Sequence, residues 1–331
     1  RYCTKLMATQ KKLIIEPIQR PRGTRDVYGE EWGHIEKLHR VAQEAFRLAG
    51  YGRVSTPVFE ETRLFERGVG EATDIVAKEM YTFEDKSGNS LTLKPEQTAP
   101  VVRAYLENGW SSMPTPLRLY YFEPNFRYDR PQAGRYRQFY VHGVEVIGDA
   151  SSAVDAEVIA LGWRIHRLLG LELSLQINSL GCSICRPRYL KELTTYYEGR
   201  YDEICEDCRS RLKLNPLRLL DCKQDAGIAA EAPQALDHLC RECHGHFAGV
   251  LEHLDELEIP YELNTGLVRG QDYYTRTTFE LWGRHQGAQN AICGGGRYDG
   301  LSAALGGPDL SGIGYAVGVD RTLLAVQAEG L

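Results

Sequence analysis

Cationic side chains are concentrated in residues 117–148, which also carry the strongest strand pattern of the sequence. Two runs rich in Tyr, Phe, Val and Ile flank a Pro-Gln-Ala-Gly segment, and this pattern predicts an antiparallel hairpin with a long tip. The arginines of the stretch are Arg118, Arg127, Arg130, Arg135 and Arg137. Guanidinium groups on a stiff scaffold can bind phosphate through two hydrogen bonds at once, so the stretch indicates a phosphate-rich ligand.

Side-chain alternation bears on two interpretations of this hairpin. In the first, it is a solvent-exposed edge hairpin whose arginines pair with Glu123 and Asp129. In the second, it forms a wall of a ligand pocket, because four residues have the parity of one strand face: Arg135, Arg137, Val141 and Glu145. A face that mixes charged and apolar side chains is unusual in a core and typical of a pocket, which favours the second interpretation.

Paired cysteines suggest a metal site. Three CxxC pairs occur, Cys182/Cys185, Cys205/Cys208 and Cys240/Cys243, while Cys222 stands alone. Two such pairs brought together give the tetrahedral thiolates that zinc prefers, and the candidate ligands are Cys182, Cys185, Cys240 and Cys243. The alternative is a set of ordinary reduced cysteines, since about 20 and about 32 residues separate successive pairs. His244 and His246 could add ligands, although a histidine beside such a pair is more often a polar surface residue.

Charged residues near helix ends allow both structural and binding roles. Glu96 and Thr98 fall at the expected N-terminus of a helix, where the helix dipole favours anions and a capping role alone would explain both. Arg321 follows a glycine-rich turn into an apolar helix. It is either a surface arginine or a long cation that projects over the sheet.

A strand near the C-terminal end carries Arg269 and the pair Tyr273 and Tyr274 in an alternating pattern. Packed tyrosines or a substrate pocket would each account for it. The run Gly294–Tyr298 lacks the spacing of a phosphate loop or a dinucleotide-binding motif. Its expected use is the close approach of the backbone to a flat ligand at a strand end, and Cys293 beside it is expected to be a small packed residue.

Composition restricts the class of protein. The chain has 331 residues, 43% of them hydrophobic, which is enough for about two packed domains. A net charge of −6 argues against a general nucleic-acid coat, so any such contact must be local. No apolar run is long enough to span a membrane, and the opening residues lack a secretory signal. Nine cysteines without such a signal indicate a reducing compartment.

Local patterns divide the chain into a sheet-rich part and a helix-rich part. Helices are predicted over 31–49, from Pro95 to near Gly109 and over 151–169, with strands over 51–59 and 171–178, and a hairpin between 81–83 and 91–93. The glycine-broken segment 64–80 is predicted to be a mobile loop. The expected domains are a disordered or tag-like lead over 1–16, a sheet domain over 17–180 and 261–331, and a helical insertion over 181–260. The helix and edge strand near residues 31–59 predict a dimer contact, with packing inside one chain as the alternative.

Seven segments resemble, in order, the motifs of histidyl-tRNA synthetases: RPRGTRDVYG, LKPEQTAPVVRAYLENG, FRYDRPQAGRYRQF, NPLRLLDCK, LVRGQDYYTRTTFELW, GGGRYDGL and GVDRTLLA. The resemblance covers nearly everything from Arg20 onward. It implies an α+β fold of the class II aminoacyl-tRNA synthetase type, an antiparallel sheet flanked by helices with a helical insertion. It also implies a cytoplasmic homodimer that uses ATP and Mg²⁺ to convert L-histidine to histidyl-adenylate and then passes histidine to the acceptor end of tRNA(His).

The resemblance implies a role for each matching residue. Arg127 and Arg269 would be the catalytic residues, acting on the amino-acid carboxylate and the α-phosphate, and Arg135 and Arg321 would hold the terminal phosphate of ATP. The positions implied around histidine are Glu96, Thr98, Glu145, Tyr273 and Tyr274. Attack of a carboxylate on a phosphate brings two anions together, so catalysis would rest on positioning and charge neutralisation, with no general base.

Three departures from the family pattern leave other functions open. Asp129 replaces a glutamate that meets adenine, Val141 replaces a glutamine of the histidine pocket, and the chain stops at Leu331, where an anticodon-binding domain is expected to follow. A histidine-sensing subunit like the regulator of ATP phosphoribosyltransferase is therefore an alternative, although the retained arginines oppose it. A generic RNA-binding module is a third alternative, which the negative net charge disfavours.

Overall fold

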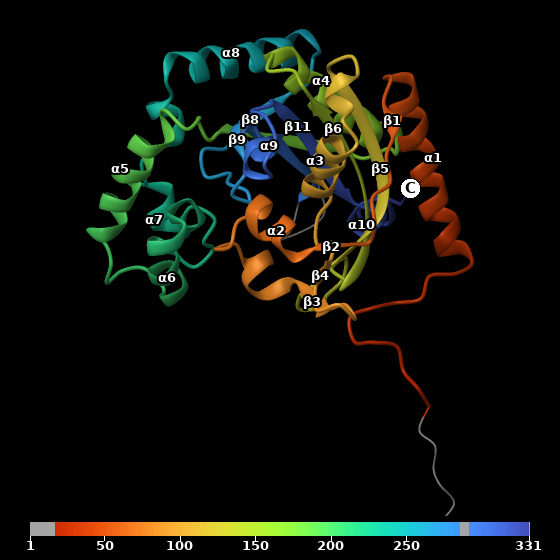
Figure 1. Ribbon diagram of the computed structural model, residues 1–331. Coiled ribbons are helices and arrows are strands. Elements are labelled where there is room, and N and C mark those ends of the chain that lie inside the picture. The colour runs from red at the N-terminus through yellow and green to blue at the C-terminus, as the bar shows by residue number, and fades with distance from the viewer. Residues whose placement is uncertain (1–16, 285–290, 331) are drawn as a thin grey trace, which may run out of the picture.

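A large, mostly antiparallel sheet forms the centre of the molecule (Figure 1). The computed structural model describes residues 17–284 and 291–330, so the predicted lead over 1–16 lies outside the described residues. In spatial order the strands are β1 (Gly52–Arg53), β5 (Leu117–Phe126), β6 (Gln138–Ile147), β11 (Gly312–Gly318), β10 (Ala291–Arg297), β9 (Thr275–Gly283), β7 (Leu173–Ser179) and β8 (Tyr261–Leu263). Only the outermost pairs in this described sheet, β1 with β5 and β7 with β8, are parallel. The predicted α+β class and antiparallel sheet are confirmed.

Helices cover one face of this sheet with a continuous apolar core. The helices of this core are α1 (Glu30–Leu48), α4 (Ser152–Leu168) and α8 (Arg241–Glu256). A further helix, α10 (Val319–Ala328), packs in two smaller apolar clusters. Phe46 of α1, Ile159 of α4 and Val250 of α8 pack with Phe279 and Val317 of the sheet. The predicted helices over 31–49 and 151–169 are confirmed. No helix within residues 17–284 and 291–330 is both long and apolar enough to cross a membrane.

The segment between β1 and β5 forms a smaller layer with its own sheet. It contains β2 (Phe59–Glu61), α2 (Thr62–Val69), the π-helix η1 (Ile75–Glu79), β3 (Tyr81–Glu84), β4 (Ser90–Leu93) and α3 (Thr98–Glu107), and the short α9 (Leu301–Ala304) packs near α3. The predicted hairpin of β3 and β4 is confirmed. The predicted strand over 51–59 is wrong, because the chain leaves the large sheet after Arg53 and pairs with β4 from Phe59. The predicted loop over 64–80 is also wrong. It is largely helical, because Phe65, Val69 and Ile75 are buried in a second core.

The central hairpin differs from the prediction at its tip. Paired residues of β5 and β6 run from Leu117 and Ile147 to Phe126 and Gln138. Arg135 and Arg137 therefore lie in the tip, beyond the strand that carries Val141 and Glu145, and the predicted common face of the four residues is wrong. The Arg137 guanidinium lies 3.8 Å from the centre of the Tyr128 ring and donates to the Arg22 carbonyl, so it fixes the tip.

The helix-rich region contains a separate small core. Helices α5 (Arg186–Glu198), α6 (Glu206–Leu214), η3 (Pro216–Leu219), α7 (Ala226–Ala230) and η4 (Ala235–His238) bury residues such as Tyr189, Tyr197 and Leu219 together. Figure 1 shows α5, α6 and α7 to one side of the sheet, whereas α8 crosses above it. Because α8 belongs to the main core, we propose that the insertion's own core ends before Cys240.

A buried ion pair ties the sheet to these helices. Arg297 of β10 and Asp155 of α4 are both fully buried, with Nη2 2.6 Å from Oδ1. His246 of α8 lies 2.8 Å from the other carboxylate oxygen of Asp155. His246, considered above as a metal ligand or a surface residue, instead joins α8 to α4.

Candidate functional site: a pocket lined by four arginines

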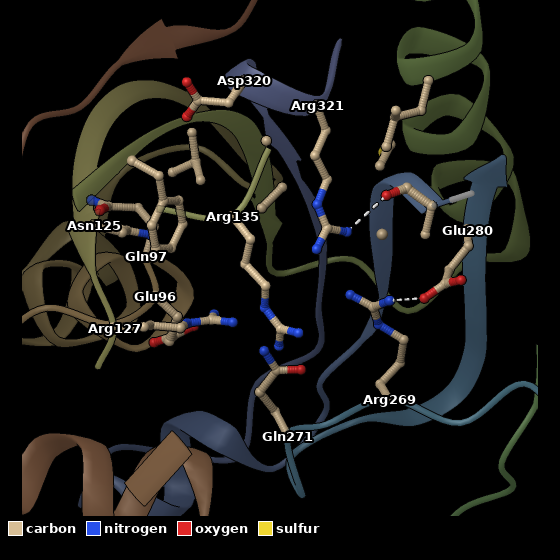
Figure 2. A pocket seen from close by; sticks show the side chains of 18 of the residues that line it. Glu96, Gln97, Asn125, Arg127, Arg135, Arg269, Gln271, Glu280, Asp320 and Arg321 are labelled. Atoms are coloured by element: carbon tan, nitrogen blue, oxygen red, sulfur yellow. Dashed lines mark hydrogen bonds and ion pairs between the residues drawn. The ribbon is translucent and has the colours of Figure 1, made fainter. Parts of the chain in front are cut away.

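Four arginines from separate segments line one pocket above the sheet (Figure 2). Arg127 follows β5, Arg135 lies in the hairpin tip, and Arg269 precedes β9. Arg321 lies in the first turn of α10. Figure 2 shows their guanidinium groups directed toward a common space. The structure therefore brings together the cations that the sequence analysis selected, although only two of the five hairpin arginines are among the residues that line it.

Arg127 is held at the base of the pocket by the backbone. Its Nε donates to the Pro95 carbonyl at 2.8 Å, and its guanidinium carbon lies 5.6 Å from the centre of the Phe139 ring. Burial lowers the pKa of Arg127, and the neighbouring Glu79 and Glu96 partly offset that effect. A partly buried cation in this position favours an anionic partner.

Arg269 forms an ion pair with Glu280 of β9, a residue that the sequence analysis missed. Trp282 Nε1 donates to the second oxygen of Glu280 at 2.7 Å, which fixes the carboxylate. Burial alone would lower the pKa of Arg269, but the Glu280 carboxylate raises it above its ordinary value. A side chain at Gly294 would collide with the Arg269 guanidinium, so this glycine makes room for a protein cation. The sequence does contain a signal for Glu280, because it is a single acidic residue between the apolar Phe279 and Leu281 of a predicted strand.

The remaining cations lie on the hairpin side of the pocket. Arg135 pairs with Asp129, while Nη1 of Arg321 donates to the Ala291 carbonyl at 3.0 Å. Burial lowers the pKa of Arg321, and the charges of Arg135 and Arg127 lower it further. The arginines therefore repel one another, and a polyanion in the pocket would relieve this repulsion.

Glu96 lies just before α3, next to Arg127 and away from Arg321 (Figure 2). Its carboxylate accepts hydrogen bonds from the backbone N–H groups of Thr98 and Ala99 at 3.0 and 2.9 Å, and from the Tyr273 hydroxyl at 3.1 Å. The helix-capping role considered for Glu96 is therefore present. Burial raises the pKa of Glu96, because the charged form loses its water.

Glu145 lies behind this end of the pocket instead of lining it. It is fully buried in β6, where Thr98 Oγ1 and the Tyr121 hydroxyl donate to Oε1 at 2.9 and 3.2 Å. Burial raises the pKa of Glu145 to about 8. The rings of Tyr273 and Tyr274, 4.7 Å apart, line the pocket nearby.

Two buried amides that the sequence analysis missed also line this end. Gln97 and Asn125 are each only 2% exposed, and Gln97 Oε1 and Asn125 Oδ1 have no hydrogen-bond partner in the described structure. Gln97 Nε2 donates to Thr56 Oγ1 at 2.7 Å, which orients the amide oxygen. Val141 lines the pocket beside Gln97 and Asn125. The valine offers no hydrogen-bond acceptor, but the two amide oxygens do. Asn125 is two residues before Arg127, so strand alternation places the two side chains on the same face, and this spacing could have identified Asn125 from the sequence.

Seven of the described cysteines gather in two groups whose members do not line the pocket, whereas Cys293 is among the lining residues. The four predicted ligands Cys182, Cys185, Cys240 and Cys243 have sulfur atoms within 4.8 Å of one another. A second group of the same compactness consists of Cys205, Cys208, Cys222 and Asp225. It was missed, because Cys222 has no neighbouring cysteine in sequence and a lone aspartate gives no signal. His244 and His246 belong to neither group.

The sequence matches one family model, described as histidyl-tRNA synthetase, over residues 23–187 and 208–322. It is 55% identical over 312 residues to the histidine–tRNA ligase of Desulforudis audaxviator, covering 93% of this chain and 74% of that protein. The corresponding ligase of Pelotomaculum thermopropionicum is 51% identical over 319 residues, covering 94% and 74%.

Solved structures show the same likeness. Apo histidyl-tRNA synthetase of S. aureus has a TM-score of 0.78 and 40% identity, covering 95% of this chain and 75% of that one. A Bacillus halodurans protein described as an ATP phosphoribosyltransferase regulatory subunit/histidyl-tRNA synthetase has a TM-score of 0.70 and 25% identity, covering 94% and 84%. The ligase structure thus has both the higher identity and the higher TM-score of the two.

Proposed function

The chain belongs to the histidyl-tRNA synthetase family, and we propose that its four-arginine pocket binds ATP and histidine side by side and joins them into histidyl-adenylate. Its overall reaction is that of the family, the ligation of histidine to tRNA, on a class II aminoacyl-tRNA synthetase fold. The regulatory alternative is not favoured, because the relatives with the higher identity are ligases.

The convergence of the arginines is the observation that carries the proposal for the ATP side. Two anions, a carboxylate and an α-phosphate, must approach each other during adenylation, and preorganised cations lower that barrier. We assign this role to Arg127 and Arg269, which are both partly buried, and assign the terminal phosphates to Arg135 and Arg321. Asp129, beside Arg135, is assigned to the adenine side of ATP.

The histidine side is assigned to the acid and hydroxyl groups at the other end. The cationic amine of an amino acid needs buried acceptors, and Glu96 and Thr98 lie where such acceptors are available. We add Gln97 and Asn125, whose unpaired oxygens support a role in holding the amine. The groups assigned to the imidazole side are Tyr273 and Tyr274, which line the pocket, with Glu145 behind them and bonded to Thr98.

Magnesium, which the family's use of ATP implies, is bound mainly through phosphate oxygens and water. Glu280 and Asp129 are pocket carboxylates that could add an oxygen ligand, so the lining fits such an ion. When bound, the ion would neutralise phosphate charge. The arginines and Glu280 would position the two substrates.

Family membership also suggests the tRNA partner, the cellular location and the oligomeric state. We propose that the acceptor end of tRNA(His) receives histidine at this pocket and that the protein acts in the cytoplasm. We also propose a homodimer formed through the β1 edge and the adjoining layer, because Val58, Phe59 and Phe83 are exposed apolar residues there.

Exchange of radiolabelled pyrophosphate into ATP tests the adenylation step. The purified chain should catalyse exchange with L-histidine and not with the other amino acids. Exchange should be lost in Arg269→Ala and Arg127→Ala, whose circular dichroism spectra should match that of the wild type. Exchange that proceeds equally without histidine would refute the proposal.

A further inference from the structure

The four sulfur atoms of the first cysteine group have the spacing of a metal-bound tetrahedron. Sγ of Cys182 lies 3.8 Å from that of Cys185 and 3.9 Å from that of Cys240, and Cys185 lies 3.8 Å from Cys243. A tetrahedral zinc ion with Zn–S bonds of about 2.3 Å requires sulfur atoms about 3.8 Å apart. All four cysteines are free. The two cysteine pairs are 58 positions apart in the sequence, and a shared metal ion explains why their sulfur atoms meet at this spacing.

The second group has similar dimensions and a different fourth ligand. Sγ of Cys205 lies 3.7 Å from that of Cys222, and Cys208 and Asp225 complete the group. The Asp225 carboxylate accepts a hydrogen bond from the Cys205 backbone N–H at 3.0 Å, which fixes it beside the sulfur atoms. Carboxylate oxygen is an accepted zinc ligand, so this group also offers four donors.

Backbone N–H groups at helix starts favour the thiolate form in both groups. Cys185 precedes α5, Cys205 precedes α6 and Cys240 precedes α8. The N–H groups of Ile184 and Cys208 point to cysteine sulfur atoms at 3.4 Å each. Hydrogen bonds and helix dipoles of this orientation stabilise negative sulfur.

We propose that the chain binds two structural zinc ions, one through Cys182, Cys185, Cys240 and Cys243 and the other through Cys205, Cys208, Cys222 and Asp225. Each group supplies four protein ligands and leaves no open position for a substrate, which is the pattern of structural zinc. The metal binding itself is independent of the roles assigned to the pocket residues, whereas its expected effect on KM for histidine rests on the proposed function.

The first zinc ion joins the insertion to the sheet domain. Cys182 and Cys185 follow β7, where the chain enters the insertion, and Cys240 and Cys243 lie where α8 returns to the main core. Next to Cys185, Arg186 donates to the Leu180 carbonyl at 3.1 Å and to the Tyr274 carbonyl at 2.5 Å. The zinc ligand Cys185 is therefore adjacent in sequence to Arg186, which is bonded to the backbone of the pocket residue Tyr274. Loss of the first zinc ion should raise KM for histidine.

The second zinc ion holds the insertion together internally. Cys208 is fully buried in the small core with Tyr197 and Leu219, and the four ligands connect α6 to the turn before α7. None of these four residues is among those that line the pocket. Its loss should expose the insertion to proteases while leaving KM for histidine unchanged.

Metal analysis of the 331-residue chain tests the proposal. Wild-type protein produced with added zinc should contain two zinc ions per chain, as measured by inductively coupled plasma mass spectrometry. The variants Cys243→Ser and Cys208→Ser should each contain one. Cys293→Ser, a buried cysteine outside both groups, should retain two. Folded wild-type protein with less than about 0.2 zinc per chain, or variants that all retain two, would overturn the proposal.

Cobalt binding to the wild-type protein provides a second test, which does not require that the cysteine variants fold. Metal-free wild-type protein should bind two cobalt ions, with the sulfur-to-cobalt charge-transfer absorption and strong visible bands of tetrahedral thiolate sites. Absence of charge transfer on cobalt addition, with the cysteines titrated as reduced, would also overturn it.

Discussion

Glu280 and Arg269 face each other across the floor of the pocket, joined by an ion pair and supported by the indole of Trp282. Apart from an oxygen ligand that it could add to magnesium, Glu280 acts on the reaction through Arg269, the arginine that it holds. The geometry makes Glu280 a positioning residue for the adenylation step.

Glu280→Gln should lower kcat for histidine-dependent exchange by about 10- to 100-fold, with a smaller change in KM, because Arg269 loses its fixed orientation. Steady-state exchange kinetics measure the two parameters separately. Glu252→Gln, on the exposed face of α8, is the matched control and should behave as wild type. A pure KM effect in Glu280→Gln would show that Glu280 contributes ordinary substrate binding instead.

Asn125→Leu should raise KM for histidine about tenfold or more and leave KM for ATP nearly unchanged. The substitution keeps the shape of the side chain but removes the unpaired oxygen that we assign to the amine. Asn89→Leu, in the exposed turn between β3 and β4, is the control. Equal increases in both KM values would place Asn125 outside the histidine end.

Glu145 should make stability depend on pH in the direction opposite to most carboxylates. Its pKa is raised from 4.5 to about 8, so between these values the folded state holds a proton that the unfolded state has lost. The wild-type Tm, measured relative to that of Glu145→Gln, should therefore fall as pH rises from 5.5 to 8. A difference that stays constant or grows over this window would contradict the raised pKa.

The buried pair of Arg297 and Asp155 predicts a large stability change. Asp155→Ala should reduce the free energy of unfolding by about 3–5 kcal/mol, because Arg297 would remain buried without its partner. Glu44→Ala, which removes the exposed partner of Arg47, should change chemical denaturation little. The pKa of Asp155 is lowered because His246 and Arg297 outweigh the effect of burial, so the pair's contribution should be lost on acidification. Equal effects of the two substitutions would show that the buried pair is not important for stability.

The sequence predicted the parts of the site that recur as local patterns. Alternation and glycine breaks were enough to predict the central hairpin, and the motif segments selected Arg127, Arg135, Arg269 and Arg321 before their contacts were visible. Periodicity failed where tertiary burial decides the structure. The segment 64–80 has two glycines and many charges, yet Phe65 and Val69 are buried beneath α3 and make it helical.

Contacts between distant segments could not be predicted from spacing. Cys222 meets Cys205 only because η3 turns the chain back on α6, and Asp225 becomes a neighbour by the same turn. Gln97 gave no periodic signal, because its importance lies in an unpaired oxygen that only three-dimensional packing reveals.

The central claim, that one pocket holds ATP and histidine together, is tested most directly by binding a non-reacting sulfamoyl analogue of histidyl-adenylate in a calorimeter. One analogue molecule should bind per chain, and saturating ATP and saturating histidine should each weaken its apparent affinity. Displacement by ATP alone, with histidine having no effect at any concentration, would contradict the account.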